Sequence, residues 1–192
     1  METLFSVAIG IGLAAACGFR VFVPLLMLNL AALSGYLVLP SGFAWMGSLS
    51  ATLVFSTATI LEIIGYYIPW LDHVLDVLAT PAAVIAGTVT TAAVVMDFSP
   101  FLKWMMALIG GGGIAGLVQA STVALRAKTS LSTASSGNPF FSTLELAGAI
   151  ITALLALFIP IVCLVLIAIF CIWIFRKMIR FLLKRKKPES NR

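Results

Sequence analysis

The sequence has few charged residues, one histidine and three cysteines. Only 10% of its 192 residues are charged and 61% are hydrophobic, whereas a soluble domain has about 25% charged and 45–50% apolar residues. The chain therefore has too few polar residues to cover a water-soluble core. The cysteines all lie in apolar stretches, in an odd number and without framework spacing, which argues against a disulfide scaffold.

The motifs of soluble enzymes are missing as well. The sequence has no serine nucleophile motif, no HExxH and no paired cysteine–histidine arrangement. The glycine run Gly110–Gly113 has no Lys-Ser or Lys-Thr after it and no strand before it, so it is not a phosphate-binding loop. We expect no enzymatic activity, no cofactor and no metal site.

Positive charge is concentrated at one place in the chain. The net charge is +5, and eight of the twelve Lys and Arg residues lie in the last seventeen positions, directly after an apolar stretch. This placement argues against nucleic-acid binding. It predicts a cytoplasmic polybasic tail, 176–192, that contacts anionic lipid headgroups at the membrane surface.

Long apolar stretches predict an all-α, polytopic transmembrane helical bundle of about six spans, because about 20 apolar residues cross the hydrocarbon layer. Pro160 lies near the middle of one apolar stretch, 140–175, so we divide that stretch into two spans. The six spans predicted are 4–28, 48–68, 81–96, 101–127, 141–158 and 161–175. We expect a helix end and an interfacial loop at 29–47, a tight turn at 97–103 and a loop at 128–139. Pro81 is expected to start the third span after a polar segment, 70–80.

The first span has its own pattern. Gly10, Ala14 and Gly18 recur at every fourth position, which predicts close packing against another helix. Pro24 cannot donate a backbone hydrogen bond and weakens the helix near Arg20. This span therefore fits the membrane with a tilt or a break.

The two halves of the transmembrane domain, 1–97 and 98–175, resemble each other weakly. The matching segments are Ile9-Gly10-x-Gly12 with Ile109-Gly110-x-Gly112, and Phe55-Ser56-Thr57 with Phe141-Ser142-Thr143, each tripeptide being followed by a glutamate and a proline. Three spans per half would insert with opposite topology, as in the inverted repeats of transporters. With both termini in the cytoplasm, Arg126, Lys128 and the basic tail lie inside and only Lys103 lies outside. This satisfies the positive-inside rule and predicts a multi-pass protein of the inner (plasma) membrane.

Three charged residues, Arg20, Glu62 and Glu145, lie well inside predicted spans. Arg20 is a permanent charge at membrane depth, where a charge costs about 2.5–3.5 kcal/mol on insertion scales. It could bind an anionic group or form an alternating pair with Glu62 or Glu145, or else snorkel to the interface or form a fixed structural pair. The two glutamates occupy matching places in the halves and could bind protons or cations, or could be protonated groups that join helices.

Further candidates are weaker. Asp72 and Asp76 share one helical face near His73, which suggests either a cation site or a solvated interfacial segment. Gln119 could line a polar path near the middle of the membrane. The four glycines could unwind to offer carbonyl groups to an ion, or could serve only close packing.

The sequence resembles a family of uncharacterised bacterial integral membrane proteins, catalogued as a domain of unknown function. The resemblance is carried by Gly18-x-Arg20-x-x-x-Pro24, Glu62, Pro69-x-x-Asp72-x-x-x-Asp76, Pro81, Gly110–Gly113, Asn138-Pro139 and Glu145. The chain departs from the family at Gly65-Tyr66, where members often carry an acidic-basic pair, and at Thr80, where they carry arginine. The resemblance implies a membrane architecture and no established activity.

These observations favour a small membrane carrier or channel for an unknown ion or solute, coupled to protons or cations and assembled as a homo-oligomer. Arg20, Glu62 and Glu145 would meet at the interface of the repeats. The first alternative is a lipid-handling protein in which Arg20 draws a lipid phosphate inward. The second is a structural or assembly subunit whose polar residues only join helices.

Overall fold

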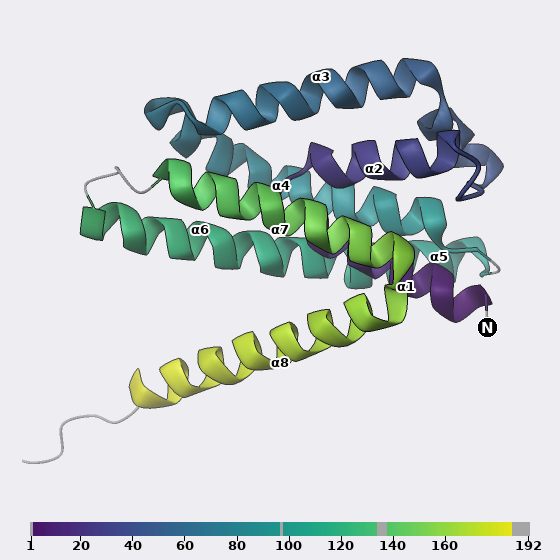
Figure 1. Ribbon diagram of the computed structural model, residues 1–192. Helices are drawn as coiled ribbons and strands as arrows, with labels where there is room; N and C mark the ends of the chain where they lie inside the picture. The colour runs from purple at the N-terminus through teal and green to yellow at the C-terminus, as the bar shows by residue number, and fades with distance from the viewer. Residues whose placement is uncertain (1, 97, 134–137, 186–192) are drawn as a thin grey trace, which may run out of the picture.

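The computed structural model describes residues 2–96, 98–133 and 138–185 (Figure 1). Every regular element in these ranges is a helix, so the prediction of an all-α bundle is confirmed. Five helical stretches of the described residues are long and apolar enough to cross a membrane: Leu49–Tyr66, Val74–Val94, Pro100–Arg126, Phe140–Phe158 and Pro160–Lys177. Two shorter apolar helices precede them, where we expected a single first span.

The expected first span is a helical hairpin. α1 (Glu2–Cys17) and α2 (Phe22–Leu33) are separated by a tight turn, and α2 runs back toward the end of the bundle where α1 begins (Figure 1). The turn is closed by the amides of Gly18 and Phe19, which donate to carbonyl groups of α1 at 3.1 and 3.0 Å. Pro24 lies in the first turn of α2, where a missing amide hydrogen does little harm.

Small residues let α1 lie in the centre of the bundle. It packs against α4 (Pro69–Val94), α6 (Gly113–Thr133), α7 (Asn138–Phe158) and α8 (Pro160–Arg185). A Cβ atom on Gly18 would lie 2.5 Å from the Cβ atom of Val118 on α6. A Cβ atom on Gly10 would lie 3.1 Å from the Cα atom of Thr91 on α4, and Ala14 between them is fully buried. The small-residue stripe therefore serves close helix packing, as predicted.

The next two helices follow a connection that contains η1 (Ser41–Gly47), a 3₁₀ helix. α3 (Leu49–Tyr66) begins after Ser48, whose hydroxyl accepts from the amide of Ala51 at 3.2 Å, and it matches the second predicted span. α4 (Pro69–Val94) contains Pro81 in its interior, so the prediction that Pro81 starts the third span is wrong. Pro81 lies on the exposed side of α4, where no neighbouring helix must accommodate its ring.

The fourth predicted span is a continuous rod of three elements: α5 (Pro100–Met105), η2 (Met106–Gly112) and α6 (Gly113–Thr133). η2 is a π-helix and contains three of the four consecutive glycines, so the glycines do not unwind. Gly111 and Gly112 are buried against α4. The rod extends beyond its predicted end into the segment 128–139, where we expected only a loop; residues 134–137 lie outside the described part.

Gly111→Ala is expected to lower the free energy of unfolding by about 1–3 kcal/mol, the usual penalty of overpacking. The new Cβ atom would collide with Oγ1 of Thr91 and lie 2.5 Å from the carbonyl oxygen of Gly87. Gly113→Ala is the matched control, because nothing lies within 4 Å of its Cβ position; it should raise helix stability by about 0.5–1 kcal/mol. Equal effects in detergent unfolding titrations would contradict the observed packing of α4 on η2.

The last two helices, α7 (Asn138–Phe158) and α8 (Pro160–Arg185), meet at Pro160, which confirms the division of the long apolar stretch. α8 does not end at residue 175 but continues into the predicted tail as far as Arg185. Beyond Arg185, the predicted tail lies outside the described residues.

The helix directions differ from a simple six-span arrangement (Figure 1). We call the end of the bundle at Arg185 the tail end; α1 begins at the opposite end. α3 and α7 run in opposite directions, as do α4 and α8, but α1 and the α5–η2–α6 rod run in the same direction. Because the hairpin returns and five long helices follow it, the start of α1 and the end of α8 lie at opposite ends of the bundle.

Candidate functional site

Arg20 lies in the turn between α1 and α2, and its side chain is only 1% exposed. Its Nη2 atom donates to the carbonyl oxygen and the hydroxyl of Ser142 on α7, at 3.1 and 2.5 Å. The same nitrogen lies 3.9 Å from Oε2 of Glu145. The Nε and Nη1 atoms are buried without a hydrogen-bond partner. Arg20 is therefore a buried cation with spare hydrogen-bond donors.

Glu62 on α3 caps the N-terminus of α2. Its Oε1 atom accepts from the amide of Val21 at 2.8 Å, and its Oε2 atom accepts from the amide of Phe22 at 3.1 Å. α2 has no side-chain cap of its own, and water is not available at membrane depth to satisfy its first amides. A carboxylate is well suited to this place, because the helix dipole is positive at the N-terminus.

Arg126 on α6 joins carboxylates from two other helices. Its Nε atom donates to Oε1 of Glu145 at 2.9 Å, and its Nη2 atom donates to Oε2 of the same carboxylate. Its Nη1 atom donates to Oδ1 of Asp76 on α4 at 3.1 Å. Arg126 is 4% exposed and Glu145 8% exposed. This two-point arginine–carboxylate geometry is the stronger form of a charged hydrogen bond.

Tyr66, in the last turn of α3, contacts both arginines. The guanidinium carbon of Arg20 lies 3.8 Å from the centroid of its ring, and that of Arg126 lies 4.3 Å away. An aromatic face attracts cations and stabilises each contact by about 0.5–2 kcal/mol. Tyr66 therefore helps to hold two like charges in one buried site.

We define the charge cluster by the residues that make these contacts: Arg20, Glu62, Tyr66, Asp76, Arg126, Ser142 and Glu145. Two arginines stand against three carboxylates, a formal charge of −1 if all are ionised. Glu145 is the eighth residue of α7, so at 1.5 Å per residue it lies about 10 Å inside the tail end. The cluster is thus within the bundle, not at its surface.

The residues predicted from the sequence are brought together only in part. Arg20, Glu62 and Glu145 belong to the cluster, and Asp76 joins it through Arg126. Gln119 is buried on α6, two turns before Arg126 and so about 10 Å along the helix from it. Asp72 and His73 lie in the first turns of α4, and their side chains are outside the described part of the structure.

Sequence reasoning missed Arg126, Tyr66 and Ser142 as members of the site. Arg126 was interpreted only as a positive charge at a membrane surface. A charge count could have found it, because the buried carboxylates need more than one cation. Apart from Arg20, the only basic residues in the predicted spans are Lys103, at the start of the fourth span, and Arg126. Nothing in the sequence marked Tyr66 or Ser142 as a partner of arginine.

The fold and the cluster define an all-helical integral membrane protein with a buried network of ion pairs. The chain belongs to the family described as Domain of unknown function (DUF4126), which matches residues 7–180. The matched range contains every residue of the charge cluster, and the resemblance seen in the sequence is confirmed. Comparison with curated proteins and with solved structures gives no match.

Proposed function

We propose that this protein is a small membrane carrier in which the charge cluster couples movement of a small anionic solute to a proton. The observation that supports this proposal is the position of Glu145. Its carboxylate is hydrogen-bonded to Arg126 and lies within ion-pair distance of Arg20. One carboxylate thus interacts with two buried arginines from different parts of the bundle.

Protonation of Glu145 would change the partners of both arginines. Arg126 would still have Asp76. Among the described residues, Arg20 has Glu145 as its only ion-pair partner within 4.0 Å, so it would lose that partner. A small anion could then bind the Nε and Nη1 atoms, which have no partner now. Binding a proton together with a monovalent anion leaves the formal charge of the cluster at −1, whereas binding either one alone would change it.

The helix geometry around the cluster supports a carrier. Secondary transporters commonly bind substrate at discontinuous helices, where helix ends within the membrane point at charged groups. Here the break between α1 and α2 contains Arg20, and the N-terminus of α2 faces the carboxylate of Glu62. η2 adds a π-helical segment within the membrane, and such segments are frequent at functional sites.

We further propose that the tail end faces the cytoplasm of a bacterial inner membrane. α6, which carries Arg126 near its end, and α8, which carries the basic residues, both end at the tail end, whereas α5, which carries Lys103, lies at the opposite end (Figure 1). This distribution is in accord with the positive-inside rule. The end of α8 is then cytoplasmic and the start of α1 is not, so we no longer expect both termini in the cytoplasm. The inverted repeat stays a prediction for α3–α4 with α7–α8, whose directions are opposite, and does not extend to α1.

Transport by purified protein in liposomes tests the proposal. Outward gradients of chloride, acetate or phosphate are imposed, and proton movement is followed with an enclosed pH-sensitive dye. We expect proton movement with at least one anion. Glu145→Gln should lower it at least tenfold, because glutamine keeps the size of the side chain but cannot bind and release the proton. Arg20→Met should lower it similarly.

Glu2→Gln is the matched control, because it removes a carboxylate at the start of α1, at the end of the bundle opposite the tail end. It should leave the flux unchanged within a factor of two. Unchanged flux in Glu145→Gln and Glu62→Gln would remove the basis of the carrier proposal. Loss of co-purified anionic lipid in Arg20→Met would favour lipid handling. Loss of thermal stability in Arg20→Met, with no flux in the wild-type protein, would favour a structural subunit.

A further inference from the structure

α8 packs against the bundle mainly through its first half. It contacts α1 and α7, and its second half points away from the other helices (Figure 1). Ile169, Ile172 and Trp173 are each more than half exposed. The bundle therefore leaves an apolar surface of α8 uncovered by its own helices near the tail end.

The charges of α8 begin where the membrane should end. Arg176 is 16 residues after Pro160 and Arg180 is 20 residues after it, which corresponds to about 24 and 30 Å of helix. A hydrocarbon layer is about 30 Å thick. Trp173 precedes the charges by one turn, a usual position for tryptophan at a membrane interface. The basic residues are thus at the depth of lipid headgroups.

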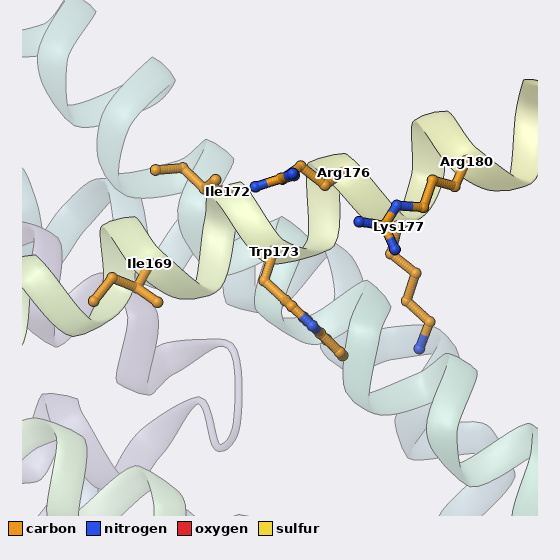
Figure 2. A pocket seen from close by; sticks show the side chains of 6 residues that line it. All are labelled: Ile169, Ile172, Trp173, Arg176, Lys177 and Arg180. Atoms are coloured by element: carbon orange, nitrogen blue, oxygen red, sulfur yellow. The ribbon is translucent and has the colours of Figure 1, made fainter.

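The exposed apolar and basic side chains line one hollow of about 570 Å³. Its described lining residues are Ile169, Ile172, Trp173, Arg176, Lys177 and Arg180. Figure 2 shows Lys177 extending alongside Trp173 and Arg180 reaching back toward the preceding turn. The Nζ atom of Lys177 lies 4.8 Å from the centroid of the Trp173 ring. Three cations therefore face a single hollow, and the side of the hollow nearer the start of α8 is apolar.

We propose that this hollow is a binding site for one anionic phospholipid. The phosphate group binds Arg176, Lys177 and Arg180, and an acyl chain lies along Ile169 and Ile172. α8 contains no Asp or Glu between Pro160 and Arg185, so nothing on the helix competes for the cations. Arginine and lysine at this depth are the groups that recognise lipid phosphates.

A second copy of the chain fits this surface less well. Two α8 helices in a symmetric contact would bring the same cations together without a carboxylate of either helix between them. A lipid satisfies both the charge and the apolar surface. This inference is independent of the carrier proposal, because it involves no residue of the charge cluster.

Binding is measured by native mass spectrometry of the purified protein with phosphatidylglycerol or phosphatidylcholine of identical acyl chains. We expect phosphatidylglycerol to bind at least tenfold more tightly. The triple variant Arg176→Gln, Lys177→Gln, Arg180→Gln should lose at least tenfold in affinity for it. The matched control removes the same charge further along the chain, by Lys184→Gln, Lys186→Gln and Lys187→Gln, and should lose less than threefold.

A second measurement follows tryptophan fluorescence and leaves the basic residues of α8 unchanged. Phosphatidylglycerol with brominated acyl chains should quench the fluorescence of Trp173. That quenching is read as the difference between the wild type and Trp173→Phe, because Trp45 and Trp104 are also exposed. Equal binding of the two lipids would overturn the proposal. Equal losses in the triple variant and its control would also overturn it, because they would indicate a diffuse attraction to the whole tail. A change of oligomeric state in place of lipid binding would assign the surface to a second copy.

Discussion

Replacing Arg126 by methionine should lower the free energy of unfolding by about 3–5 kcal/mol, the effect of removing one partner from a buried ion pair. Methionine has a similar length and no charge, so the packing around Tyr66 is largely kept. The substitution leaves Glu145 and Asp76 without their guanidinium group. These carboxylates would then be buried as anions or take up protons, and either outcome destabilises the native arrangement at neutral pH.

The effect can be separated from a general loss of charge by unfolding titrations in mixed micelles. Lys103→Met removes a cation that is 5.1 Å from the Phe43 ring and is not paired with a carboxylate in any described contact, so it should change stability by about 0.5 kcal/mol. Adding Glu145→Gln to Arg126→Met should recover part of the loss, because the side chain that has lost its hydrogen bonds from Arg126 is then neutral. If Arg126→Met costs no more than Lys103→Met, the buried pair does not stabilise the fold.

The long helices could be predicted from the sequence because apolar length alone determines a membrane span. The division of the apolar stretch 140–175 at Pro160 was correct, since a full span precedes this proline and another follows it. Pro81 misled us because a proline inside an apolar pattern does not reveal whether a helix ends or continues past it. The hairpin of α1 and α2 was only hinted at by Gly18 and Pro24. The N-terminus of α2 is capped by Glu62, which is 40 residues from Phe22 in the sequence.

The site was predicted incompletely for a similar physical reason. A charge in an apolar span is conspicuous, so Arg20, Glu62 and Glu145 could be found. Their partners depend on how five helical segments pack, which the sequence does not state. Ser142 drew notice only as part of a repeated tripeptide, yet its hydroxyl accepts from Arg20. Arg126 lies near a span end, where a positive charge normally needs no buried partner.

Glu62→Leu should lower the free energy of unfolding by about 3 kcal/mol or more, because each hydrogen bond to a charged group contributes about 1.5–3 kcal/mol. The substitution leaves the amides of Val21 and Phe22 without an acceptor. Glu62→Gln should lose about half as much, since its single amide oxygen can replace only one carboxylate oxygen. Thr59→Val is the matched control one turn earlier on α3. Its hydroxyl is buried without a partner, so the change should be neutral or stabilising.

Hydrogen exchange measured by mass spectrometry distinguishes loss of the cap from general loosening of the bundle. In Glu62→Gln, peptides that cover residues 18–25 should exchange faster, while peptides from the middle of α3 and α4 should keep wild-type rates. The expected change is local because α2 has no side-chain cap of its own and the interior offers no water to replace the carboxylate. Faster exchange throughout α3 and α4 would instead mean that Glu62 supports the whole bundle. The hairpin could then not move separately, and a carrier mechanism that depends on partner exchange around Arg20 would lose its mobile element.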